Sequence, residues 1–164
     1  MTPTSIATQL ETMGYCIYPD FLSPSELLET RDDLDTIQKA HGFHRAGVGH
    51  GTTLQVHETV RRDEICWLDR ENRNEVQARL WGKVDRLQKE LNSPPYYLGL
   101  DSFEGHYASY PSGGFYRRHL DRSINESSRV VSFVVYLNID WKPGDGGRLR
   151  IFKNKTPDSP YSDV

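Results

Sequence analysis

Apolar residues recur at helical spacing in the first part of the chain. Spacings of four and three predict a short helix over about residues 5–13, and residues 15–18 read as a short strand. The sequence SPSE at 23–26 is a capping box with proline at the first helical position, so a second helix should begin there. The longest apolar stripe predicts a third helix over about 74–91 and consists of Val76, Leu80, Val84, Leu87 and Leu91. Such stripes are typical of core packing, so these helices should support the rest of the domain.

Shorter apolar runs separated by turn-forming residues follow the third helix. Residues 96–100 and 103–110 are rich in aromatics, and a Pro-Ser-Gly-Gly turn leads into an expected strand over 115–121. Residues 129–137, RVVSFVVYL, are almost all apolar, which is typical of a strand buried on both sides. Residues 147–152 alternate apolar and basic side chains. Helices followed by short antiparallel strands predict an α+β domain.

Composition limits the class of protein. The 164 residues fit one domain, with 36% hydrophobic and 26% charged residues, and the net charge of −3 gives no reason to expect nucleic acid. Cys16 and Cys66 lie in apolar runs and read as buried thiols, without a disulfide framework. The N-terminus has no secretory signal pattern, and no apolar run reaches membrane-spanning length. We therefore expect a cytoplasmic protein with no nucleic acid or membrane partner.

The candidate chemistry centres on His119 and Asp121. Residues i and i+2 of a strand point to the same face, so this imidazole and carboxylate can approach one metal ion. Together they supply two-thirds of the 2-His-1-carboxylate set of non-haem Fe(II) oxygenases. The spacing alone is a weak signal in a chain with six histidines. Asp32, Asp33 and Asp35 are expected to form the solvated face of the second helix, because adjacent helical positions do not converge.

The surroundings of the pair follow a longer pattern. The pattern begins with a tyrosine, a glycine turn, a second tyrosine and the His-x-Asp pair. It continues with an arginine, an apolar run ending in Tyr-Leu-Asn, a tryptophan and a Gly-Gly hairpin. The residues are Tyr110, Gly113, Gly114, Tyr116, His119, Asp121, Arg129, Tyr136, Leu137, Asn138, Trp141, Gly146 and Gly147. This stretch resembles the Fe(II)- and 2-oxoglutarate-dependent dioxygenases of the prolyl 4-hydroxylase type, in particular the hypoxia-factor prolyl hydroxylases and their bacterial relatives.

The resemblance implies a fold, cofactors and a reaction. It implies a double-stranded β-helix, a form of jelly roll, with residues 1–95 as helical support and 96–164 as the first part of the core. Fe(II) would be held by His119 and Asp121, and 2-oxoglutarate would be the cosubstrate, with ascorbate as a reductant. Tyr136 would bind the far carboxylate of 2-oxoglutarate, and Tyr110 would lie beside it; the alternative is that both are ordinary strand aromatics. The substrate would be a peptide or protein, with peptidyl proline as the default.

Other aromatic and basic residues of the pattern are expected to have supporting roles. Tyr116 and Trp141 would pack or line the substrate rim. The Arg-Arg-Asp sequence at 61–63, which precedes an apolar run containing Trp67, would be supporting structure.

The sequence departs from the resembled family after the Gly-Gly hairpin. The family has a second histidine ligand and then an arginine for 2-oxoglutarate, but this chain has no histidine after His119. We therefore expect that the late strands are missing, that the chain is inactive alone, and that it is aggregation-prone. The upstream histidines should all be surface or loop residues rather than substitutes, and His106 is the best placed of them to substitute; the others are His41, His44, His50 and His57. The alternative is a noncatalytic remnant or binding module, which the intact site residues disfavour.

Overall fold

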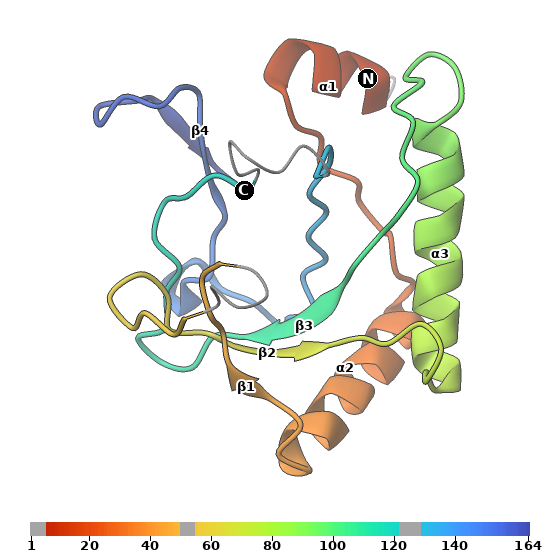
Figure 1. Ribbon diagram of the computed structural model, residues 1–164, viewed down its shortest axis with the longest axis vertical. Coiled ribbons are helices and arrows are strands. Elements are labelled where there is room, and N and C mark those ends of the chain that lie inside the picture. Colours follow the sequence, from red (N-terminus) through yellow and green to blue (C-terminus); the bar gives the residue numbers. More distant parts are fainter. Residues whose placement is uncertain (1–5, 50–54, 122–128) are drawn as a thin grey trace.

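The computed structural model describes residues 6–49, 55–121 and 129–164, and it has helices and short antiparallel strands (Figure 1). The helices are α1 (Ile6–Met13), α2 (Pro24–Lys39) and α3 (Glu75–Leu91). One antiparallel sheet has the order β1-β2-β3, and a separate hairpin joins β4 to β5. The strands are β1 (His44–Arg45), β2 (Glu64–Trp67), β3 (His106–Ser109), β4 (Arg150–Phe152) and β5 (Tyr161–Asp163). The predicted α+β class is confirmed, and no helix in the described part of the chain could cross a membrane.

Local sequence signals set the beginnings of the two long helices. The Ser23 hydroxyl accepts a hydrogen bond from the Glu26 backbone amide at 3.3 Å, and the Glu26 carboxylate accepts one from the Ser23 amide at 2.7 Å. This reciprocal capping satisfies two amides that the helix itself leaves unpaired. Asn74 caps α3 by accepting from the Gln77 amide at 2.9 Å. All three predicted helices are present at nearly the predicted bounds.

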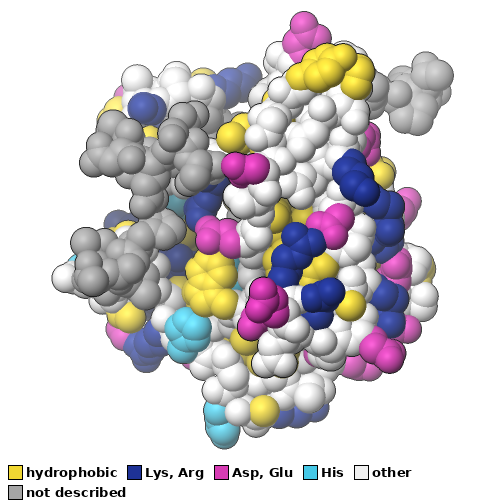
Figure 2. Space-filling model, turned by 45° about the vertical axis from the view of Figure 1, so that its right-hand side comes forward, with side chains coloured by type: hydrophobic (Ala, Val, Ile, Leu, Met, Phe, Trp, Pro, Cys, Tyr) yellow, Lys and Arg dark blue, Asp and Glu magenta, His cyan; other side chains and the backbone are white. Residues whose placement is uncertain are grey.

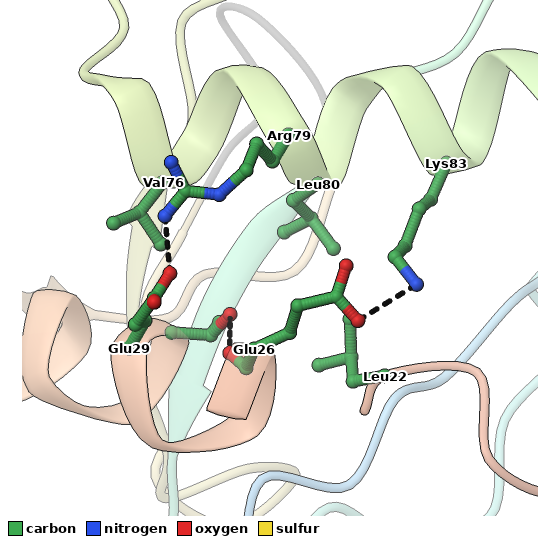
Figure 3. Close-up of a pocket in the computed structure, with 8 residues that line it drawn as sticks. Leu22, Glu26, Glu29, Val76, Arg79, Leu80 and Lys83 are labelled. Carbon is green, nitrogen blue, oxygen red and sulfur yellow. Dashed lines mark hydrogen bonds and ion pairs between the residues drawn. The ribbon is translucent and has the colours of Figure 1, made fainter. Parts of the chain in front are cut away.

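The two long helices pack against each other through apolar side chains and charged pairs. Leu34 of α2 and Trp81 and Val84 of α3 are buried. A shallow hollow between the helices contains two ion pairs, Glu26 with Lys83 at 2.9 Å and Glu29 with Arg79 (Figure 3). On the face turned forward in Figure 2, acidic and basic side chains alternate. The apolar stripe of α3 was predicted to pack in the core, and the packing of α3 against α2 agrees with that role.

Asp33 of α2 differs from the prediction of a solvated acidic face. Its carboxylate accepts hydrogen bonds from the Tyr107 hydroxyl at 2.9 Å, from the Gln77 amide at 3.0 Å and from the Asn74 amide at 2.5 Å. Burial, followed by this hydrogen bond, raises the pKa of Tyr107, so the hydroxyl remains a donor at neutral pH. One carboxylate therefore fastens α2 to α3 and to β3.

The strands are fewer than predicted. Residues 15–18, 96–100, 115–121 and 129–137 form no strand, and only four residues of the predicted run 103–110 do. Apolar sequence favours extended backbone, but a strand exists only where a neighbouring chain completes its hydrogen-bond ladder.

The segment 129–139 shows this most clearly. It makes no backbone hydrogen bond to another described residue. Residues 129–137 of this segment were predicted to form a strand buried on both sides, yet Val130 and Val134 are 54% and 55% exposed. In Figure 1 its blue trace runs past β3 as a thin coil. The prediction of a buried strand is therefore wrong for this structure, because the partners that would cover the segment are not among the described residues.

Candidate metal and cosubstrate site

Long-range backbone pairing places the segment that leads to the candidate ligands. The amide of Arg62 donates to the Phe115 carbonyl at 2.7 Å, and the amide of Arg117 donates to the Val60 carbonyl at 2.9 Å. The turn before it needs glycine at position 114, because a Cβ there would lie 2.8 Å from the Pro111 carbonyl oxygen. Pairing and turn together fix where the chain arrives at His119.

The structure brings His119 and Asp121 together, although residues 115–121 are not the expected strand. The Nε2 atom of His119 lies 3.0 Å from Oδ1 of Asp121, and its Nδ1 lies 2.8 Å from the Arg117 carbonyl oxygen. The ring can donate from Nδ1 to the Arg117 carbonyl and from Nε2 to the Asp121 carboxylate, and a metal ion bound between the two side chains would take the place of the Nε2 proton. Such an outer hydrogen bond is the usual way in which proteins orient a ligating histidine.

The distance between the two donor atoms suits one metal ion. An octahedral ion with bonds of about 2.1 Å holds neighbouring ligand atoms about 3.0 Å apart, by the geometry of a right angle. An imidazole nitrogen and a carboxylate oxygen are also the donor types of the non-haem Fe(II) site. The side chains of His119 and Asp121 are 34% and 47% exposed, so solutes can reach them. The donor set therefore fits two positions of an Fe(II) ion.

The electrostatics keep the Asp121 carboxylate ionised. The hydrogen bond from His119 is the main cause that lowers the pKa of Asp121 to about 2, and Ser132 and Arg129 act in the same direction. The same hydrogen bond raises the pKa of His119 above its usual 6.5. Arg129 also donates to the Asp121 carbonyl oxygen at 3.3 Å while it pairs with Glu104 at 2.5 Å. Arg129 thus restrains the ligand segment from outside.

Tyr136 and Tyr110 occupy different settings. The Tyr136 hydroxyl accepts from the Leu149 amide at 3.0 Å and donates to the Val164 carbonyl at 3.5 Å. A carboxylate of 2-oxoglutarate would therefore have to replace the contact with Val164 to accept the same proton. Burial of the hydroxyl, followed by the nearby charge of Asp63, raises the pKa of Tyr110 to about 12, although the residue is 48% exposed. The charges of Tyr116 and Tyr136 also raise the pKa of Tyr110.

The remaining histidines do not complete the pair in the part of the chain that the structure describes. His106 packs edge-on against Trp67, with ring centroids 4.8 Å apart, and burial lowers its pKa. His41, His44 and His57 are exposed, and His50 lies outside the described residues. Within 6–49, 55–121 and 129–164 no group of three His, Cys, Asp or Glu side chains could hold a metal.

Arg61 and Tyr116 form a layer behind His119. From the sequence alone, only supporting roles were predicted for these two residues. The rings of Tyr116 and His119 stack with centroids 3.6 Å apart and an angle of 13° between their planes. The Arg61 guanidinium lies 4.1 Å from the centroid of the Tyr116 ring. The sequence signal was the Arg-x-Asp at 61–63, but nothing in it indicated that this segment pairs with 115–117.

Comparisons with known proteins show what the chain as a whole is similar to. The family model described as "2OG-Fe(II) oxygenase superfamily" matches residues 105–164. Egl nine homolog 1 of Homo sapiens is 30% identical over 146 residues, which are 85% of this chain and 33% of that protein, and the Mus musculus homolog is 29% identical. The crystal structure of a Pseudomonas putida prolyl-4-hydroxylase matches with a TM-score of 0.81 and 35% identity, over 97% of this chain and 79% of that one. The chain thus spans about a third of the length of its Egl nine relatives.

Proposed function

The chain belongs to the 2OG-Fe(II) oxygenase superfamily, and from this premise we propose for it the chemistry of an Fe(II)- and 2-oxoglutarate-dependent hydroxylase. Its fold is the α+β jelly-roll type of the prolyl-4-hydroxylase that it matches. The observation that carries the proposal is the 3.0 Å separation of His119 Nε2 and Asp121 Oδ1, which suits two positions on one metal ion. The substrate class we propose is a peptidyl residue, with proline first, because the structural relative is a prolyl-4-hydroxylase.

Each site residue has a proposed task. Bound Fe(II), with 2-oxoglutarate and O2, supplies the oxidising chemistry that no side chain can perform. His119 and Asp121 would hold the ion, and the Arg117 carbonyl keeps a proton on Nδ1 so that Nε2 can exchange its hydrogen bond with Asp121 for the metal. Asp121 stays anionic because its pKa is about 2, so it offsets part of the metal charge at neutral pH.

The cosubstrate contacts are a separate part of the proposal. Tyr136 would donate its hydroxyl to the far carboxylate of 2-oxoglutarate, exchanging its 3.5 Å contact with the Val164 carbonyl for a charge-assisted hydrogen bond. Tyr110 would line the same space as a protonated phenol, since its pKa is raised to about 12. We further propose ascorbate as a reductant and a cytoplasmic location, where Fe(II) is kept reduced.

The described residues place two protein donors at the site, and this sets how firmly the described part of the chain should hold a metal. Two donors hold a metal less firmly than three, so we expect weak Fe(II) binding and no detectable hydroxylation from these residues alone. A noncatalytic binding module is the second candidate function, favoured by the same observation. The two differ in whether metal and 2-oxoglutarate binding are coupled at His119 and Asp121.

Calorimetric titration separates the candidates. 2-Oxoglutarate is titrated into the protein under anaerobic conditions with and without Mn(II), a redox-stable substitute for Fe(II). We expect 2-oxoglutarate to bind only when Mn(II) is present and the effect to be lost in Asp121→Ala. Tyr136→Phe should weaken 2-oxoglutarate without changing Mn(II) affinity, because the hydroxyl contacts the cosubstrate and not the ion. If 2-oxoglutarate binds equally well without Mn(II) and in Asp121→Ala, the hydroxylase proposal is overturned in favour of the binding module.

A further inference from the structure

Three flat groups lie on top of one another behind the candidate metal pair. The imidazole of His119 stacks on one face of the Tyr116 ring at 3.6 Å, nearly parallel to it. The guanidinium of Arg61 lies over the Tyr116 ring at 4.1 Å. His119 is therefore held in two independent ways: its hydrogen bond to the Arg117 carbonyl fixes the direction of its nitrogens, and the stack restrains the plane of its ring.

The far end of this stack is immobilised. Arg61 donates from Nε to Asp63 Oδ1 at 2.8 Å, from Nη2 to Asp63 Oδ2 at 2.5 Å and from Nη1 to the Gly47 carbonyl at 3.1 Å. Asp63 is 1% exposed, and the Arg61 side chain is 11% exposed. A guanidinium held at three nitrogens, two of them by the buried Asp63 carboxylate, cannot turn away from the ring, because each contact fixes the plane of the same fork.

The backbone brings the stack into register. Arg61 and Tyr116 are partners in an isolated antiparallel bridge, flanked by the hydrogen bonds of Arg62 to Phe115 and of Arg117 to Val60. Arg61 and Tyr116 are thus paired through both their backbones and their side chains. The chain then needs only three residues to pass from Tyr116 to His119.

We propose that Arg61 is a positioning residue for the metal ligand His119, acting through the Tyr116 ring, with Asp63 as the buried anchor of Arg61. Metal sites require their ligands to be held within about 0.5 Å and 10–20° of the binding geometry. The 13° stack on an immobilised guanidinium supplies this restraint to a histidine whose side chain is otherwise 34% exposed. The proposal rests on the proposed function for the statement that His119 binds metal, but not for the statement that Arg61 orients the ring.

The test compares variants that break the stack at different levels. Arg61→Lys keeps the charge but loses the planar fork. Tyr116→Leu removes the ring and leaves the Arg61–Asp63 pair intact, whereas Tyr116→Phe keeps the ring. Arg70→Lys is the matched control, because Arg70 also pairs with an aspartate, Asp85, and also lies over an aromatic ring, that of Trp81 at 5.0 Å.

The first readout is the NMR signal of the His119 ring protons at one fixed pH, assigned by their disappearance in His119→Ala. Stacking over a tyrosine face shifts these protons upfield from those of the exposed His57. We expect Arg61→Lys and Tyr116→Leu to move them towards the His57 position, and Tyr116→Phe and Arg70→Lys to leave them in place. The second readout is the dissociation constant of Mn(II) alone, which we expect to rise about 10-fold in Arg61→Lys and Tyr116→Leu.

The possible outcomes distinguish a role of Arg61 in orienting the His119 ring from a role in stabilising the fold alone. If Arg61→Lys lowers the melting temperature but leaves the His119 signals and Mn(II) affinity like those of Arg70→Lys, Arg61 is structural only and the proposal is overturned. If Arg61→Lys does not fold, the Tyr116 variants decide, since they leave the buried pair untouched. If the unaltered protein binds no Mn(II) at His119, the proposed function fails, while the ring signals still show whether Arg61 orients this histidine.

Discussion

Removal of the Asp33 carboxylate should destabilise the protein far more than removal of its neighbour Asp32. Asp33→Ala leaves the Tyr107 hydroxyl and the Gln77 amide without their shared acceptor, and these residues are only 4% and 7% exposed. A buried donor without a partner costs about 1–3 kcal/mol. Two such donors give about 2–6 kcal/mol, a large part of a typical stability of about 5–15 kcal/mol. Asp32 is exposed, so Asp32→Ala should stay within about 0.5 kcal/mol.

Urea unfolding followed by circular dichroism measures both changes. With a slope of about 2 kcal/mol per molar urea, the middle of the usual range, Asp33→Ala should lower the midpoint by about 1–3 M. The loss should shrink by about 1–3 kcal/mol in a Tyr107→Phe background, because that variant has no hydroxyl to leave unpaired. Equal midpoints for Asp32→Ala and Asp33→Ala would refute the view that Asp33 joins α2 to α3 and β3.

Three further predictions concern the ligand pair and the exposed apolar segment. Acid unfolding should depend on Asp121, because its pKa is lowered in the folded protein from the ordinary 3.8 to about 2. The ionised carboxylate therefore stabilises the fold at pH values above 3.8, and this contribution is lost as the pH falls towards about 2. Asp121→Asn should make the stability, measured by circular dichroism, depend less on pH in this range. In equilibrium dialysis, Mn(II) binding should be weak and should fall in His119→Ala and Asp121→Ala but not in His57→Ala; equal losses would contradict the assignment of the pair. Val134→Lys should reduce self-association in light scattering, whereas Val56→Lys, at a site of similar exposure (53% against 55%), should not. The reason is that Val134 lies on the segment 129–139, which makes no backbone hydrogen bond to another described residue.

The sequence predicted best what depends on near neighbours. The capping box at Ser23 and Glu26 and the apolar stripe of α3 are complete within a few residues, so their helices form where the pattern indicates. Asp33 could not be assigned in this way, because its partners Asn74, Gln77 and Tyr107 are 41, 44 and 74 residues away. Nothing local distinguishes it from the exposed Asp32.

The same limit applies to the strands and to the candidate site. The apolar run 129–137 carries the composition of a buried strand, but composition does not supply the neighbour that a ladder requires. The spacing of His119 and Asp121 was enough to suggest that they meet, because side chains two positions apart in the sequence stay close in space even where the expected strand does not form. The role of Arg61 could not be seen, because it arises from the pairing of 60–62 with 115–117.

Paramagnetic broadening by Mn(II) tests the metal assignment most directly, because it maps the ion residue by residue and does not depend on turnover. Mn(II) is added in small steps to isotope-labelled protein, and the loss of each backbone and histidine signal is followed. We predict that signals of Tyr116, His119 and Asp121 vanish first and that Asp121→Ala abolishes this pattern. Broadening that centres on the acidic face of α2 or on His41 and His44, or that is unchanged in Asp121→Ala, would contradict the assignment of His119 and Asp121 as metal ligands.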